Sequence, residues 1–342
     1  MRKEGVDGGE IFQDWGSRKL LVLAIVQKVN ENSYNLETIF RAIKLDQLKF
    51  RITGDFSFFM PCLGLLKGCG SGNPCPLCDQ ERSKCGGGAA KWVEGADVNL
   101  RSFGSLMYNY AGWVLEGEHS QAIKTKRWKS VTGPVLIMGV DDMPETFILD
   151  KLIPGPLHLY LSLNEVLNYC EKNCWPELKA VLQTVSRAKV HVYMGKIGNY
   201  EGPNIRKIFQ KLENLKRYMT NEKEPYYNAL VAFKQVSESV FGTKLHPSWR
   251  EHLHNLKDVI HVLVSSEGMP LTPKLHVLTV HVEQWIDRND RAMGKEGESS
   301  GEALHHIWKR MEESQGEIKD KDSKAYKNTV LNLLLRFNVN NL

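Results

Sequence analysis

The sequence has no long apolar run, no large excess of charge and no internal repeat. Its longest unbroken apolar stretch, Leu20 to Val26, is far shorter than the ~20 residues that a membrane-spanning helix requires. Charges at Arg2, Lys3, Glu4 and Asp7 are followed by no apolar segment, which argues against a secretory leader. We therefore expect a nuclear or cytoplasmic protein with no membrane partner.

The composition is that of a folded protein. Its 342 residues suit about two or three domains, and a hydrophobic content of 42% is enough to form a core. The formal net charge is +5, which permits a nucleic-acid surface without requiring one. Composition thus excludes a disordered tail and a mini-protein, and leaves the function open.

The seven cysteines are an odd number and are clustered, which does not suit a secreted disulfide framework. Five of them lie between Cys62 and Cys85, a region rich in glycine. In a reducing compartment such a cluster more often binds metal than forms disulfides. Cys170 and Cys174, spaced as neighbours on one face of a helix, are interpreted as small core residues.

Hydrophobic patterns predict an α/β segment followed by a long helical block. Residues 19–27 and 48–53 have the pattern of strands, and a helix over 34–48 between them would complete one parallel βαβ unit. From 61 to about 96 the periodicity disappears, and a basic stretch (Lys124, Lys126, Arg127, Lys129) follows. Further helices are predicted at 157–185 with a break at Pro176, 204–219, 226–241 and 249–264.

The sharpest local motif is Cys75-Pro-Leu-Cys78, because two thiolates at this spacing can reach one Zn²⁺ from a single turn. His276 and His281, five apart on an apolar stretch, fit the spacing of a second ligand pair. A zinc ion held by all four would staple the entry of the helical block to its exit. The alternative is a free CxxC in a loop and two unrelated core histidines. Cys69 and Cys85 are substitute ligands.

Two carboxylates are candidate ligands for Mg²⁺. Asp55 follows a predicted strand, where open α/β sheets place their chemistry, and Glu302 opens a predicted helix. Two such groups could hold ions that activate water for an in-line phosphoryl displacement. The structural alternatives are a turn role for Asp55 after Gly54, and a capping box formed by Ser299 and Glu302. Spacing alone favours these alternatives.

The order of several longer stretches resembles that of a known family. The stretches LKFRITGDFSFF, CPLC, IPGPLHLYL, EGPNIRKIF, LHVLTVHVEQW and EGESSGEALHHIWKR follow one another along the chain. Together they resemble the DDE transposases of the Transib type and the catalytic core of the vertebrate V(D)J recombination-activating recombinase. The resemblance runs from about Arg18 to the C-terminus, and the spaced combination is more specific than any one stretch.

The resemblance implies a role for each matched residue. Asp55 would be the second catalytic aspartate of an RNase H-like fold and Glu302 the closing glutamate, with Mg²⁺ held between them. Arg206 and Lys207, in the stretch that resembles the DNA-engaging helical insert, become candidate phosphate contacts; the alternative for them is a solvated helix face. The four residues implied as ligands of a structural zinc are Cys75, Cys78, His276 and His281.

The first aspartate of the family is the point at which the resemblance fails. It lies on an opening strand that precedes two further strands, and residues 1–18 are too few for these. Asp7 is either an accidental match or the remnant of a lost segment. Because two-metal chemistry needs the full carboxylate set, we expect no strand-transfer activity.

We therefore predict an α/β fold with an all-α insertion, comprising three regions. Residues 1–60 would form a partial RNase H-like βαβ segment, 61–282 a zinc-stapled helical insertion, and 283–342 the returning helices that carry Glu302. The function expected is that of a transposase-derived, zinc-binding and DNA-binding protein. The rivals are a regulatory protein that has lost catalysis and an interaction module with no nucleic-acid role. An open sheet edge would also invite a homodimer or a partner chain.

Overall fold

The structure, a computed structural model, describes residues 33–44, 51–66, 72–81, 98–117, 120–138, 143–190 and 198–295, together with 328, 331 and 332. The chain divides into two compact units, residues 31–297 and a second unit of 1–30 with 298–342. Nearly all of the described residues belong to the first unit. The strand predicted at 19–27, the two cysteines Cys69 and Cys85, and Glu302 lie outside the described residues.

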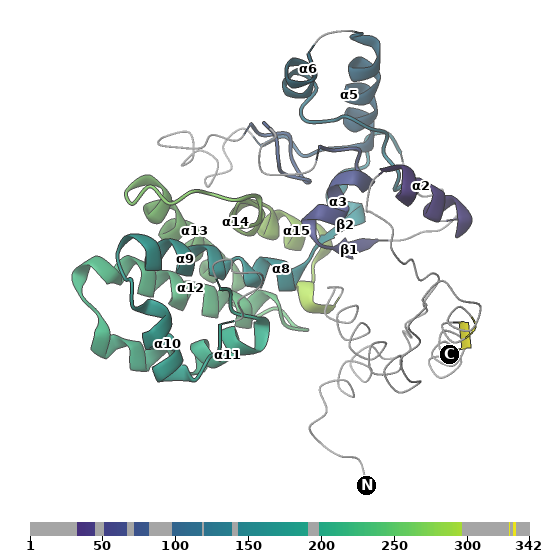
Figure 1. The fold of residues 1–342 in the computed structure, drawn as a ribbon. Coiled ribbons are helices and arrows are strands. Elements are labelled where there is room, and N and C mark those ends of the chain that lie inside the picture. The colour runs from purple at the N-terminus through teal and green to yellow at the C-terminus, as the bar shows by residue number, and fades with distance from the viewer. Residues whose placement is uncertain are drawn as a thin grey trace. The chain divides into compact units, whose positions relative to one another are not determined.

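The described part of the chain is mostly helical and includes a two-stranded parallel sheet. Strand β1 (Ile52–Gly54) pairs with β2 (Leu152–Pro154) so that Gly54 lies opposite Pro154. The ends of the two strands therefore lie together, and each runs directly into a helix. The helix after β1 is α3 (Phe56–Cys62), and α8 (Pro156–Leu161) follows β2 (Figure 1).

Helices account for most of the remaining described elements. On the N-terminal side of β2 they are α2 (Ser33–Ala42), α5 (Phe103–Leu115), α6 (Gln121–Arg127) and α7 (Ile148–Lys151). After α8 come α9 (Leu163–Asn173), α10 (Leu178–Ser186), α11 (Gly202–Gln210), η2 (Leu212–Tyr218), η3 (Asn221–Lys223), α12 (Glu224–Val240), α13 (Trp249–Ser265), α14 (Pro273–His276), η4 (Val277–His281), α15 (Val282–Asn289) and η5 (Met293–Lys295).

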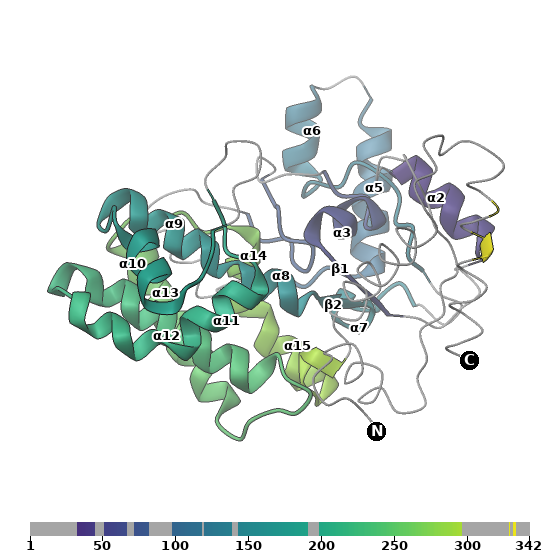
Figure 2. The same ribbon diagram turned by 60° about the horizontal axis from the view of Figure 1, so that its bottom comes forward.

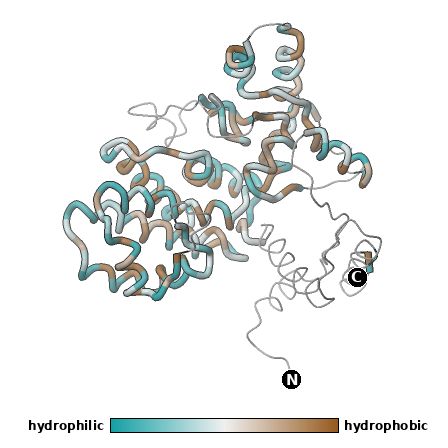
Figure 3. Tube along the Cα trace, in the orientation of Figure 1, coloured by the Kyte–Doolittle hydropathy of each residue, from teal (hydrophilic) through white to brown (hydrophobic). Residues whose placement is uncertain are grey.

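Within the 31–297 unit the helices form two groups. Helices α9 to α13 gather into one block, in which α12 and α13 pack along each other, while α5 and α6 lie side by side away from that block (Figures 1 and 2). Apolar and hydrophilic positions alternate along the helices, as Figure 3 shows, which gives each helix a face to bury. None of the described helices combines the length and the apolar character needed to cross a bilayer.

Helix α15 ties the helical block to the sheet. The buried Trp285 donates a hydrogen bond from its indole Nε1 to the Leu152 carbonyl of β2 at 3.1 Å. One turn further on, Arg288 pairs through two guanidinium nitrogens with the Asp150 carboxylate of α7. These contacts hold the residues just after His281 against the strand that pairs with β1.

The structure confirms several predicted helices and alters others. The break at Pro176 is present, because α9 ends at Asn173 and α10 begins at Leu178. The helix predicted at 204–219 is instead α11 followed by the 3-10 turn η2, whose Leu212 and Leu215 are both buried three residues apart. Strand β2 was not predicted, because three residues are too few to show a periodicity.

Candidate metal centre

Four buried side chains from two distant segments meet at one point. One ligand atom from each of Cys75, Cys78, His276 and His281 lies within 4.8 Å of the other three. All four residues have 0% exposure. Two sulfurs and two imidazole nitrogens are a donor set that a metal ion such as zinc prefers. The predicted convergence of the CxxC and HxxxxH motifs is therefore confirmed.

The distances suit a tetrahedral ion. Cys78 Sγ lies 3.3 Å from His276 Nε2, and the Nε2 atoms of His276 and His281 are 3.2 Å apart. Metal bonds of ~2.1 to ~2.3 Å separate tetrahedral ligands by roughly 3.4 to 3.8 Å. Binding of an ion would therefore bring the two most distant ligand atoms, which are 4.8 Å apart or less, closer by at most about 1 Å.

The two cysteines lie on a tight turn that backbone bonds hold in place. The Leu77 N–H donates to Cys75 Sγ at 3.4 Å, which directs the sulfur toward the centre. On the opposite side, Cys78 forms an isolated antiparallel bridge with Leu100, and the Asp79 N–H donates to the Asn99 carbonyl at 3.1 Å. The CxxC motif is thus braced by a segment about twenty residues later in the sequence.

A rare helical turn brings the two histidines together. In an α-helix of 3.6 residues per turn, side chains five positions apart point in different directions. Residues Val277–His281 instead form a π turn, whose i→i+5 bonding places residues five apart near one another. The Thr279 hydroxyl donates a hydrogen bond to the Leu275 carbonyl at 3.0 Å. This bond serves a carbonyl whose usual i→i+4 backbone donor is shifted by the wide π turn. The HxxxxH spacing is therefore matched to this local geometry.

The second ring nitrogen of His281 is already engaged. Its Nδ1 lies 2.7 Å from Gln284 Oε1, so Nδ1 carries the proton and Nε2 presents its lone pair to the centre. That lone pair faces His276 Nε2, which in turn faces Cys78 Sγ. A single proton can serve only one of these contacts, whereas one cation satisfies all of them. Gln284 therefore supports the centre, and its only signal in the sequence is its position three residues after His281.

The two thiols differ in acidity. Burial acts to raise the pKa of Cys75, but hydrogen bonds from the Cys78 thiol and the backbone N–H groups of Leu77 and Cys78 outweigh it, so the pKa lies below that of an ordinary thiol. The hydrogen bond to Cys75, together with burial, raises the pKa of Cys78 to about 11. Of the two thiols, Cys75 is therefore the first to lose its proton as the pH rises. A bound dication would favour the thiolate form of both.

Arg101 is a supporting residue that the sequence did not reveal. Its side chain is 1% exposed, and burial lowers its pKa from the ordinary arginine value. Nε donates to the Cys75 carbonyl at 3.1 Å, and Nη2 donates to the carbonyls of Asn73 at 3.2 Å and Lys129 at 3.1 Å. Among the described residues, no carboxylate lies within ion-pair distance of it. Arg101 therefore fixes the backbone on both sides of Cys75.

Of the two predicted carboxylates, Asp55 lies among the described residues. Asp55 lies just beyond β1, as predicted, and acts as the N-cap of α3 by accepting a bond from the Phe58 N–H at 2.7 Å. Its Oδ1 also accepts from the Ser57 hydroxyl at 2.7 Å. Burial acts to raise the pKa of Asp55, but these bonds and the nearby charge of His158 outweigh it and lower the pKa. The distance to Glu302, and with it the Mg²⁺ site, lies outside the described residues.

Substitutions of Asp55 are expected to separate capping from charge. Asp55→Ala should cost about 1 kcal/mol of unfolding free energy, whereas Asp55→Asn retains a capping acceptor and should cost only a few tenths. Because the folded pKa lies below the unfolded value of 3.8, the charge stabilises the fold above pH ~4. That contribution is lost as the pH falls through the folded pKa, so wild type and Asp55→Asn should converge.

Urea denaturation between pH 7 and pH 3 measures both effects. Ser102→Ala is the matched control, since Ser102 caps α5 through a capping box and has no charge. Its cost should stay constant over the pH range. An Asp55→Ala variant as stable as wild type at pH 7 would show that the cap contributes nothing.

The predicted basic residues fall into two classes. Arg206 and Lys207 lie on the exposed side of α11, while Ile205, Ile208 and Phe209 are buried on the other. Lys124, in contrast, is 7% exposed, with Nζ 4.2 Å from the centroid of the Trp113 ring. It is therefore part of the packing between α5 and α6 and contributes nothing to a basic surface.

No protein-family model matches the chain, and no curated protein matches it. The function is therefore inferred from the geometry of the site and from the motifs of the sequence.

Proposed function

We propose that this chain is a transposase-derived DNA-binding protein built on part of a DDE core, with a zinc ion that joins its helical insertion to that core. By itself the chain is expected to lack strand-transfer activity. The observation that carries the proposal is the meeting of Cys75 and Cys78 with His276 and His281. The family resemblance names these four residues as one set although the pairs lie 198 positions apart.

The closed character of the centre supports a structural role for the ion. A catalytic zinc site keeps one position open for water or substrate, whereas structural sites have four protein ligands. Here four donors are present and each ligand residue is fully buried. Because a site of this kind does not exist in the unfolded chain, the binding energy of the ion becomes folding energy.

The neighbourhood of Asp55 supports the comparison with a DDE core. Parallel strands carry chemistry at their carboxyl ends, and here the ends of β1 and β2 lie together in register. Asp55 follows one strand, and His158, four residues after the other, is close enough to influence its pKa. In such a core, Asp55 would hold Mg²⁺ together with Glu302, and the ions would activate the attacking water or 3′-hydroxyl. The resemblance supplies two of the three carboxylates from this chain.

Binding to duplex DNA and cleavage of supercoiled plasmid test the proposal. We expect the zinc-loaded chain to bind duplex DNA with a log Kd that rises with log salt by about 0.9 for each phosphate contacted. Arg206→Ala with Lys207→Ala should reduce this slope by about two and weaken binding to all sequences alike. Supercoiled plasmid incubated with Mg²⁺ or Mn²⁺ should remain uncut. Anisotropy titrations and agarose gels measure the two effects.

The control is Lys172→Ala with Lys244→Ala, which removes the same charge from exposed positions elsewhere. It should leave the salt slope nearly unchanged. Nicking that disappears in Asp55→Ala would show that the chain is an active nuclease. Absent or salt-independent binding at low ionic strength would refute a DNA-binding role.

A second candidate is a zinc-stabilised interaction or regulatory module with no nucleic-acid role. The observation that favours it is the engagement of Asp55 as a helix cap, which gives this carboxylate a structural use. Under this alternative, zinc would still be needed for stability, while DNA binding and cleavage would both be absent.

A further inference from the structure

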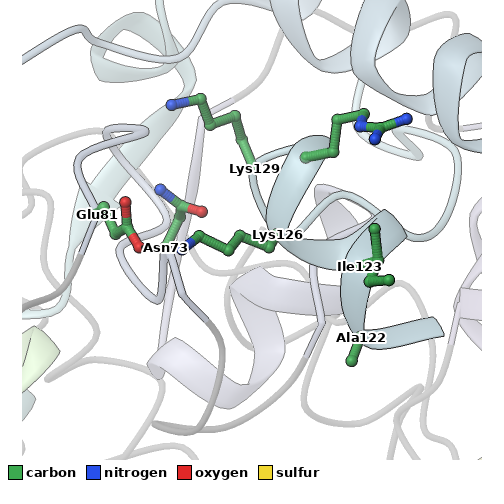
Figure 4. A pocket seen from close by; sticks show the side chains of 7 residues that line it. Asn73, Glu81, Ala122, Ile123, Lys126 and Lys129 are labelled. Atoms are coloured by element: carbon green, nitrogen blue, oxygen red, sulfur yellow. Dashed lines mark ion pairs between the residues drawn. The ribbon is translucent and has the colours of Figure 1, made fainter. Parts of the chain in front are cut away.

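A pocket of about 640 Å³ opens beside the CxxC segment, on the side of α6. Its polar lining comes from Asn73 and Glu81, which flank the motif, from Lys126 and Arg127 at the end of α6, and from Lys129 just after it. Lys126 extends from the other wall to Asn73 and Glu81, and the Lys129 side chain runs above it along the same side, as Figure 4 shows. This volume falls in the range of small-molecule sites, and it exceeds what a single phosphate group fills.

The described lining residues include three cations, Lys126, Arg127 and Lys129, and one carboxylate, that of Glu81. Arg127 is engaged with Glu116 outside the pocket. Lys126 pairs with Glu81 at 3.3 Å, and these side chains are 74% and 60% exposed, so that ion pair contributes little and is easily exchanged for another anion. The remaining charge of Lys129 has no counterpart among the described lining residues. The pocket therefore has a surplus of positive charge.

The backbone that carries Lys129 is strained and firmly held. Lys129 and Ser130 have φ values of 53° and 67°, in a region that non-glycine residues seldom occupy. Arg101 donates to the Lys129 carbonyl, and the Ser130 hydroxyl accepts from the Asn73 N–H at 3.1 Å. Strain of this kind persists only where the surroundings impose it, and it concentrates at sites with a function. A lysine on a rigid turn is a preorganised ligand for an anion.

We propose that this pocket binds phosphate groups, with Lys126 and Lys129 as the charged contacts and Glu81 as the group that an incoming phosphate displaces. The ligand class is a phosphodiester segment of nucleic acid or a free phosphate compound, since the chemistry of recognition is the same for both. In the first case the site extends the DNA-binding surface of the proposed function. It is distinct from Arg206 and Lys207, which lie on α11.

Two variants with opposite expected effects test the site. Lys126→Gln with Lys129→Gln should weaken binding of the occupying phosphate by tenfold or more, and lower the salt slope for a 20-base-pair duplex by about two. Glu81→Gln removes the competing carboxylate and should strengthen binding several-fold, a gain that misfolding cannot produce. The probes are inorganic phosphate and tripolyphosphate by calorimetry, and the labelled duplex by anisotropy, all with zinc-loaded protein.

Lys172→Gln with Lys244→Gln is the matched control, and thermal melting verifies that each variant folds. If the variants change affinity for the duplex, the source is nucleic acid; if they change affinity for inorganic phosphate or tripolyphosphate alone, the source is a free phosphate. Either result supports the pocket, and the second does so even where DNA binding fails altogether. Unchanged affinities for all three probes in both pocket variants would overturn the proposal, although DNA binding through Arg206 and Lys207 would stand.

Discussion

Removal of zinc is expected to lower the melting temperature by about 10 °C. An ion that binds only the folded chain stabilises it by about 4 kcal/mol when free zinc is 1,000-fold above Kd. For a unit of the size of residues 31–297, each kcal/mol corresponds to roughly 2–4 °C. The loss should be reversed by adding zinc, and elemental analysis of protein purified without chelator should give one zinc per chain.

The loss of stability on zinc removal should be largest in the helices that the ligands connect to the rest of the fold. His276 and His281 begin the segment that continues into α15, whose Trp285 and Arg288 hold β2 and α7. We therefore expect hydrogen exchange in α9 to α15 to increase more than in β1 and the helix after it.

Single-ligand variants provide a stricter form of this prediction. Cys78→Ser and His281→Ala should lose similar stability and should both lose the ion, because each leaves three donors. Cys170→Ser is the matched control, because it changes a buried cysteine of α9 that is not a ligand of the proposed ion. The Sγ of Cys170 lies 3.4 Å from that of Cys174. This control should retain one zinc per chain. Stoichiometric zinc in Cys78→Ser, or a chelated protein with unchanged melting, would contradict the proposed site.

Replacement of Arg101 by methionine is expected to cost 3 kcal/mol or more of unfolding free energy. Methionine fills much of the same volume but leaves three backbone carbonyls without their donor, at about 1–3 kcal/mol each when buried. Relief of the cost of burying the guanidinium offsets part of this loss. Arg101→Lys keeps the charge, yet one ammonium cannot reach all three acceptors, so its loss should be intermediate.

Arg41→Met is the control, because it makes the same arginine-to-methionine change at an exposed position. Arg41 is exposed and forms an i,i+4 pair with Glu37, which contributes about 0.3–0.5 kcal/mol. Urea unfolding at fixed zinc concentration measures the difference between the two sites. A loss below 1 kcal/mol for Arg101→Met would mean that the carbonyls find other donors, and that Arg101 does not position the CxxC segment.

The ligand set was predictable because metal coordination leaves a local imprint on sequence. Each pair of ligands must come from one short element, so CxxC and HxxxxH are visible as spacings. The spacings themselves suggested that the two pairs hold one ion, and the family resemblance favoured this over two unrelated pairs. The π turn that makes a five-residue spacing work was not predicted, since Val277–His281 has the composition of an ordinary apolar helix.

Other features depended on contacts that no local pattern records. Arg101 sits in the stretch NLRS, where nothing marks it as buried, and its partners lie 26 and 28 residues away. Lys124 belongs to a basic stretch of the kind that usually faces solvent, yet its side chain packs over Trp113. Strand β2 depends on pairing with β1, one hundred residues earlier, rather than on its own sequence. In each case tertiary packing overrides the local preference.

The separation of the ligand pairs also orders events during synthesis. Cys78 precedes His276 by 198 residues, which a ribosome adds in about 10–40 s at 5–20 residues per second. During that interval the nascent chain holds two thiols of a coordination shell whose imidazoles do not yet exist. A messenger truncated anywhere within that span yields a product that cannot complete the shell. If the four residues bind the proposed ion, metal loading is a late step of biogenesis, and it distinguishes chains elongated past residue 281 from shorter ones.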